Sequence, residues 1–233
     1  MIKIIQLTKA LFLLFIIMSN AIADDIIKNG CENGIAKECS HLAFLYEIKS
    51  IYNNKYNKEV VYYYKKACSL DKKECGGLAS LYANGKGVEK NYIKAIKLYK
   101  YACDYGSLFS CLQLGIIYKN GNFIKKNYKK AVKLFRKVCM SNNPSWEGGC
   151  LFLGDMYKDG LGVTKDINLA IKYYNDVCNK GKQPFGCVIL GDLYMNGKEV
   201  DKNITKSRNF YKKACPEKQG KKCNKYFFIN TNI

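Results

Sequence analysis

The sequence predicts an all-α fold, an α-solenoid of stacked αα-hairpins, from three observations. Twelve cysteines form six close pairs, and each pair follows the one before it by 35 to 39 residues. Within each period a leucine, a small residue and a tyrosine recur at fixed places. A glycine and an Asn or Asp then separate two apolar stripes with helical spacing. A period of this length is typical of stacked supersecondary units, so we expect an array rather than one globular core.

The first helix of each repeat is predicted from the residues that follow its opening cysteine. Positions three, six and seven are apolar in all five copies, the spacing of a helix that buries one face. The small fourth residue suits a close approach between helices. In chain order, the third residues are Leu42, Leu78, Leu114, Leu153 and Leu190, the fourth are Ala43, Ala79, Gly115, Gly154 and Gly191, and the seventh are Tyr46, Tyr82, Tyr118, Tyr157 and Tyr194.

The turn and the second helix are predicted in the same way. Glycine can end the first helix with a positive φ, and Asn or Asp can cap the second. These positions hold Gly85, Gly121, Gly160 and Gly197, followed by Asn91, Asn127, Asp166 and Asn203. The first repeat departs, with Lys49 for the glycine and with Asn57 displaced by a longer turn. An aromatic lies four residues before each closing cysteine, namely Tyr64, Tyr99, Phe135, Tyr174 and Tyr211.

An export signal is expected at the N-terminus. Lys3 and Lys9 precede the apolar run Ala10–Met18, and Ala21-Ile22-Ala23 is a small-residue cleavage pattern. The run is too short to span a bilayer, and no comparable run follows. We therefore expect a secreted or periplasmic monomer without a transmembrane segment. The predicted segments are a signal peptide (1–23), an N-terminal cap (24–38), five repeats (39–74, 75–110, 111–149, 150–186 and 187–222) and a C-terminal capping helix (223–233).

Export favours disulfide bonds for the cysteines. A zinc site would need shorter spacings and histidines, but six to ten residues lie between the members of each pair, and His41 is the only histidine. No metal or cofactor is expected. A bond could close each hairpin, as Cys39 with Cys68, or join consecutive hairpins, as Cys31 with Cys39. Only the second pattern uses all twelve, as Cys31–Cys39, Cys68–Cys75, Cys103–Cys111, Cys139–Cys150, Cys178–Cys187 and Cys215–Cys223.

The formal charge is +20, or +18 once Lys3 and Lys9 leave with the signal. Such a charge favours an anionic surface as partner, for example glycans or lipid headgroups. The simpler interpretation is a solvated lysine-rich face, because AT-rich coding also yields abundant Lys, Asn, Ile and Tyr. Arginine, the usual residue for bidentate phosphate contacts, occurs only as Arg136 and Arg208. A specific nucleic-acid partner is therefore not expected.

Two repeats carry a recognisable pattern: a Leu-Gly pair, a Tyr, G-x-G-V, then Asp, Ala and an aromatic pair. It is complete in Leu153 to Tyr157, Asp159-Gly160-Leu161-Gly162-Val163 and Ala170 through Tyr174, and nearly so in Leu81 to Tyr99. These segments resemble the Sel1-like repeat, a TPR-like unit. With its leader and paired cysteines, the chain resembles the Helicobacter cysteine-rich protein family over nearly all of 31–223. The resemblance implies a right-handed solenoid stapled by disulfides and a slow β-lactamase that binds and hydrolyses penicillin-type antibiotics.

The sequence contains no β-lactamase motif set that would carry this chemistry. Ser69-Leu70-Asp71-Lys72 matches S-x-x-K, but S-D-N and K-T-G are missing, and Ser69 is expected in an inter-repeat loop. A metal-dependent enzyme would need several histidines, and His41 is expected to be a packed or surface residue. The catalytic residues are therefore unknown, and whether the chain is an enzyme stays open.

Two functions remain as hypotheses. One is the binding and slow hydrolysis of a β-lactam, or the binding of a peptidoglycan-derived small molecule. The other is a scaffold that holds a peptide, protein or glycan on the inner curve of the solenoid. Polar first-helix residues would line that curve, or would simply be solvated: Asn84, Lys119, Asp155, Lys158, Asp192 and Asn196. The loop Met140–Gly149 holds Trp146, either as a contact site or as an indifferent insertion.

Overall fold

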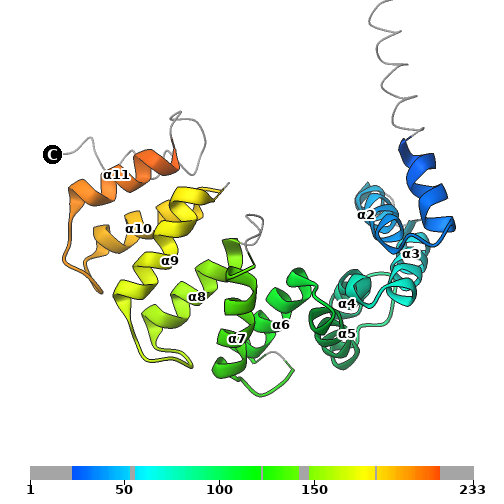
Figure 1. Cartoon of the computed structure of the whole chain (residues 1–233), viewed down its shortest axis with the longest axis horizontal. Coiled ribbons are helices and arrows are strands. Elements are labelled where there is room, and N and C mark those ends of the chain that lie inside the picture. The colour runs from blue at the N-terminus through cyan, green and yellow to red at the C-terminus, as the bar shows by residue number, and fades with distance from the viewer. Residues whose placement is uncertain (1–22, 53–55, 122, 142–146, 182, 216–233) are drawn as a thin grey trace, which may run out of the picture. The chain divides into compact units, whose positions relative to one another are not determined.

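The computed structural model describes residues 23–52, 56–121, 123–141, 147–181 and 183–215, in which helices alternate with turns and no strand occurs (Figure 1). The chain forms two compact units, Met1–Ser110 and Cys111–Ile233. The predicted all-α repeat architecture is confirmed. None of the helices in the described ranges is both long and apolar enough to cross a membrane. Residues 1–22 of the predicted signal peptide lie outside these ranges.

The first unit begins with a helical stretch, residues 23–32, and continues as packed helices. Helix α2 packs on α3, and α4 packs on both α3 and α5. Its elements are α2 (Ala36–Tyr52), α3 (Asn57–Leu70), the 3-10 turn η2 (Lys72–Glu74), α4 (Cys75–Asn84), α5 (Tyr92–Asp104) and the start of α6 (Leu108–Asn120).

The second unit continues the same arrangement. Helix α8 packs on α7 and α9, and α10 packs on α9 and α11, so consecutive helices form a layered stack. After the remainder of α6, its elements are α7 (Tyr128–Cys139), α8 (Glu147–Asp159), α9 (Ile167–Lys180), α10 (Phe185–Asn196) and α11 (Ile204–Ala214).

The repeated positions form the core. All five leucines and all five aromatics are buried. Beside the rings, the small fourth residue is required: a Cβ on Gly154 would lie 2.6 Å from Cε1 of Tyr174, and one on Gly191 would lie 2.3 Å from Cε1 of Tyr211. In the third, fourth and fifth repeats, where the fourth residue is glycine, a ring of the second helix therefore packs against the backbone of the first.

The predicted helix ends are also found. The side chains of Asn91, Asn127, Asp166 and Asn203 accept hydrogen bonds of 2.8–2.9 Å from backbone N–H groups three residues later. Gly85, Gly121, Gly160 and Gly197 have φ between 64° and 74°. In the first repeat, where Lys49 replaces the glycine, α2 continues to Tyr52. Asn57 is not a cap there: it is the first residue of α3, and Tyr56 precedes it without a side-chain capping bond.

Four disulfides join each hairpin to the next. They are Cys31–Cys39, Cys68–Cys75, Cys139–Cys150 and Cys178–Cys187, with Cα–Cα distances of 4.3–4.6 Å. Cys103, Cys111 and Cys215 are disulfide-bonded as well. The pairing of Cys103 with Cys111 stays a prediction. So does that of Cys215, because Cys223 lies outside the described residues.

Candidate functional site

A cleft of about 200 Å³ lies at the C-terminal ends of α8 and α10, in the second unit. Two of the six polar residues that the sequence singled out, Lys158 and Asn196, line it. The complete lining is Lys158, Asp159, Leu193, Asn196, Lys198 and Glu199.

The turns after two glycines build this cleft. Gly160 and Gly197 end α8 and α10 with φ values of 68° and 64°, so the two adjacent repeats turn at equivalent positions. Lys165, in the first turn, lies 2.7 Å from a carboxylate oxygen of Glu199, in the second. This ion pair ties the two turns together, and its Glu199 also lines the cleft.

Both charge signs are present in the cleft. The ammonium of Lys158 lies 3.5 Å from a carboxylate oxygen of Asp159. The hydrogen bond from Lys165 holds the pKa of Glu199 below its usual value, so Glu199 is a carboxylate at neutral pH. Lys158 is half-buried, and Lys198 adds an exposed cation. The cleft can therefore receive a ligand that carries an anionic and a cationic group, with the amide of Asn196 as a hydrogen-bonding partner.

The two predicted aspartates serve another purpose. The hydroxyl of Tyr174 donates a 2.7 Å hydrogen bond to Asp155, and that of Tyr211 donates a 2.7 Å bond to Asp192. Burial, together with the Asp155 carboxylate, raises the pKa of Tyr174 well above its usual value. Both aspartates thus satisfy buried tyrosine hydroxyls, a role that the sequence analysis did not anticipate.

The other predicted polar positions lie away from the cleft. Asn84 donates a 3.3 Å hydrogen bond to Ser80 on its own helix. The ammonium of Lys119 lies 5.1 Å from the ring centroid of Phe152. Trp146 lies outside the described residues. The structure therefore brings Lys158 and Asn196 together, and leaves Asn84 and Lys119 in local contacts.

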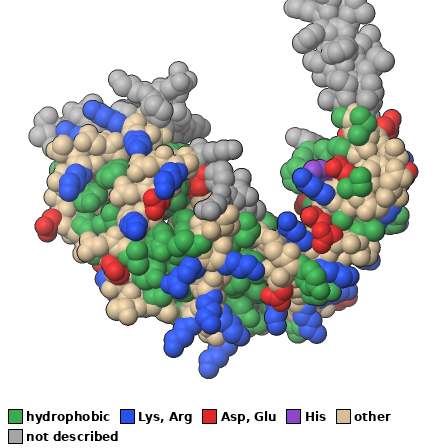
Figure 2. Space-filling model, viewed as in Figure 1, with side chains coloured by type: hydrophobic (Ala, Val, Ile, Leu, Met, Phe, Trp, Pro, Cys, Tyr) green, Lys and Arg blue, Asp and Glu red, His purple; other side chains and the backbone are tan. Residues whose placement is uncertain are grey.

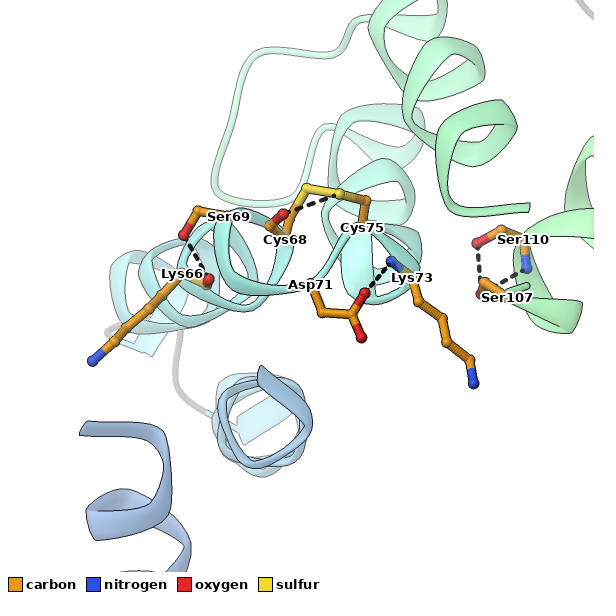
Figure 3. The surroundings of a disulfide bond; sticks show 8 residues. All are labelled: Lys66, Cys68, Ser69, Asp71, Lys73, Cys75, Ser107 and Ser110. Carbon is orange, nitrogen blue, oxygen red and sulfur yellow. Dashed lines mark hydrogen bonds between the residues drawn. A yellow bond between two sulfur atoms is a disulfide. The ribbon is translucent and has the colours of Figure 1, made fainter. Parts of the chain in front are cut away.

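Ser69 is not in a loop, as expected from the sequence, but in the last turn of α3 (Figure 3). Its hydroxyl donates a 2.7 Å hydrogen bond to the carbonyl of Lys66. Helix α3 ends at Leu70, and Lys72 lies in η2 with its ammonium 5.7 Å from the ring centroid of Tyr101. The S-x-x-K match therefore does not place serine and lysine on one helical turn, as a serine β-lactamase requires.

His41 is a surface residue of α2, and its Nδ1 lies 3.5 Å from a carboxylate oxygen of Glu38. Within the described ranges, no group of three or more His, Cys, Asp or Glu side chains could hold a metal ion.

The Sel1 repeat model matches five segments that together cover more than half of the chain: residues 61–72, 75–107, 108–143, 148–180 and 184–215. No curated protein matches the chain.

Several solved structures are similar. A protective antigen of uropathogenic Escherichia coli, c5321, which displays an SLR fold, is 27% identical with a TM-score of 0.69, covering 83% of this chain. The alignment spans only 40% of that protein. A Sel1 repeat protein from Oxalobacter formigenes is 22% identical with a TM-score of 0.66, over 79% of this chain and 74% of that one.

Cysteine-rich protein B of Helicobacter pylori is 34% identical, over 59% of this chain and 97% of its own, with a TM-score of 0.46. The matched repeats span the packed hairpins described above, and the cysteine pairs lie between them. The chain therefore belongs to the Sel1 repeat family, and it is of the cysteine-rich type that the sequence predicted.

Proposed function

We propose that this protein is an exported, disulfide-stapled scaffold that binds a peptide-containing partner without cleaving it. The observation that carries the proposal is the lining of the α8–α10 cleft: two lysines, two carboxylates, an asparagine and a leucine. A peptide offers carboxylates, amines and amides that these groups can pair with. None of the six side chains is a Ser, Thr, Cys or His, so the lining supplies groups for binding but none of the usual nucleophiles for acyl transfer.

Export is supported by the disulfides, which persist in an oxidising compartment and are rare in the cytosol. Peptidoglycan fragments fit the same proposal, since their stem peptides carry both charge signs. Cell-wall or secreted peptides are therefore the ligand class that suits both the compartment and the cleft.

β-Lactam binding with slow hydrolysis is the second candidate, and it rests on the resemblance to the cysteine-rich family. The carboxylate of a penicillin could pair with Lys158 or Lys198 in the cleft. Hydrolysis would then need a nucleophile from outside the cleft. The S-x-x-K serine, Ser69, does not line the cleft, and its hydroxyl donates a hydrogen bond to the carbonyl of Lys66.

A binding experiment with one matched control tests the scaffold proposal. Calorimetry with a muramyl peptide should give saturable binding that weakens at least tenfold in the Lys158→Gln/Lys198→Gln variant. Lys172→Gln/Lys180→Gln removes the same charge from exposed positions of α9 and should leave binding unchanged. Equal affinities of the two variants would place the ligand elsewhere.

Hydrolysis is tested separately with a chromogenic cephalosporin. The scaffold proposal expects rates at the buffer background, in wild type and in Ser69→Ala alike. A measurable rate that Ser69→Ala abolishes would overturn it and restore the serine enzyme.

A further inference from the structure

The positive charge is concentrated in the third repeat. Between residues 125 and 137, seven of thirteen residues are basic and none is acidic. The set is Lys125, Lys126, Lys129, Lys130, Lys133, Arg136 and Lys137, hereafter the α7 basic ridge. By contrast, the fourth repeat, 150–186, has five lysines against four aspartates. Composition alone would spread lysine more evenly than this.

Helix α7 turns its cations to one side. At about 100° per residue, its five basic positions fall within roughly 120° of arc. The opposite side of the helix is the core, where Ala131, Phe135 and Val138 are fully buried. All seven ridge residues are exposed. Figure 2 shows Lys and Arg side chains gathered on the part of the second unit where Figure 1 places α7.

Carboxylates do not neutralise the centre of the ridge. No ion pair in the described residues joins Lys129, Lys130 or Lys133 to an acid. Lys130 and Arg136 contact aromatic residues instead. The ammonium of Lys130 lies 5.2 Å from the ring centroid of Tyr118, and Arg136 donates a 2.8 Å hydrogen bond to the hydroxyl of Tyr157. Lys129, Lys130 and Lys133 therefore present a positive field to solvent.

An exposed aromatic residue lies at the N-terminal end of the ridge. Phe123 is 60% exposed and has a φ of 63°. It occupies the position held in the second and fourth repeats by Gly87 and Gly162, whose φ values are 69° and 73°. A bulky residue in this conformation is strained, whereas glycine adopts it freely. Met140, at the other end of α7, is 58% exposed.

We propose that the α7 basic ridge and Phe123 form a docking surface for an anionic phospholipid bilayer. Clustered lysines attract anionic headgroups, and an exposed aromatic beside them can enter the headgroup region. A hydrophilic polyanion such as a glycan or nucleic acid would match the lysines but would leave Phe123 unused. This proposal is independent of the ligand cleft, because none of the cleft residues belongs to the ridge.

Vesicle co-sedimentation of the oxidised full-length mature protein tests the proposal. With 30% phosphatidylglycerol in phosphatidylcholine, we expect binding that falls as salt rises. Pure phosphatidylcholine should bind at least tenfold less. The Lys126→Gln/Lys129→Gln/Lys133→Gln variant should lose roughly 100-fold in partition coefficient, as expected for three lysines near an anionic surface.

The control variant Lys65→Gln/Lys97→Gln/Lys100→Gln removes the same charge from exposed positions of α3 and α5, and it should lose less than tenfold. Phe123→Ser should weaken vesicle binding several-fold and leave binding to heparin unchanged. Equal losses in the two triple variants would show that net charge, not the ridge, is responsible, and would overturn the proposal. So would binding to heparin without binding to vesicles. Circular dichroism of each variant checks that the fold is intact.

Discussion

The hydroxyl of Tyr174 donates a 2.7 Å hydrogen bond to the carboxylate of Asp155, nineteen residues earlier on the facing helix of the same hairpin. Tyr211 and Asp192 repeat the arrangement one hairpin later, also at 2.7 Å. In the third repeat the two positions are Phe135 and Ile116, so ring hydroxyl and acceptor are replaced together. In the third, fourth and fifth repeats, the residue on the first helix is therefore matched to the ring on the second.

This matching predicts that substitutions of Asp155 and Tyr174 have coupled effects on the free energy of unfolding. Asp155→Ile alone leaves a buried hydroxyl without its acceptor and should cost about 1–3 kcal/mol in free energy of unfolding. Adding Tyr174→Phe copies the third repeat and should recover most of that loss. A double-mutant cycle by urea denaturation measures the coupling. Strictly additive effects would mean that the hydrogen bond contributes nothing.

The same tyrosine predicts a loss of stability at alkaline pH. Burial and the Asp155 carboxylate raise the pKa of Tyr174, so the folded protein keeps its proton above pH 10, whereas an unfolded tyrosine loses it near pH 10. The unfolded state then binds fewer protons, and the free energy of unfolding falls as pH rises above about 10. Urea denaturation between pH 8 and 11 should show that the free energy of unfolding falls less steeply with pH in Tyr174→Phe than in wild type. Identical slopes would contradict this assignment.

Two glycines of α8 form a matched test of close packing. A Cβ on Gly154 would lie 2.6 Å from the ring of Tyr174, whereas one on Gly148 would meet only Cδ2 of Leu112, at 3.5 Å. Gly154→Ala should therefore cost about 1–3 kcal/mol. Gly148→Ala should be neutral or stabilise the protein by about 1 kcal/mol, because alanine is the better helix former. Calorimetry should show a lower unfolding midpoint for Gly154→Ala and an unchanged or higher midpoint for Gly148→Ala.

Reduction should loosen the array. Each of the four disulfides seen closes a loop of 7 to 11 residues. Such a bond stabilises a folded chain by roughly 2.5 kcal/mol in the chain-entropy model. The combined contribution of several such disulfides would approach the whole net stability of an ordinary domain, about 5–15 kcal/mol. Thermal unfolding with and without reductant measures this, and an unchanged midpoint would contradict it.

The repeating parts of the fold could be predicted because they depend on neighbours in sequence. A cap such as Asn127 acts on the N–H three residues later, and Gly121 ends the helix at its own position. The first repeat shows the limit of this reasoning. Without a glycine at position 49, only the structure shows how far α2 extends, and it ends at Tyr52.

The site was less predictable because it depends on packing between helices. The sequence predicts that Asp155 either lines the inner curve or is simply solvated, but its carboxylate accepts a hydrogen bond from Tyr174, a contact set by how α8 and α9 meet. The signal that could have revealed it was the joint replacement by Ile116 and Phe135. The ion pair between Lys165 and Glu199 joins two turns of different repeats, and no local pattern in the sequence marks it.

The central claim is that disulfides join consecutive hairpins and so hold the repeat array in shape. Peptide mapping of the non-reduced, mature protein by mass spectrometry tests it most directly, including the bonds predicted for Cys103 and Cys215. We predict linked peptides for Cys139 with Cys150, for Cys103 with Cys111 and for Cys215 with Cys223. Linked peptides within a hairpin, such as Cys39 with Cys68, or free thiols in the mature protein would contradict the account.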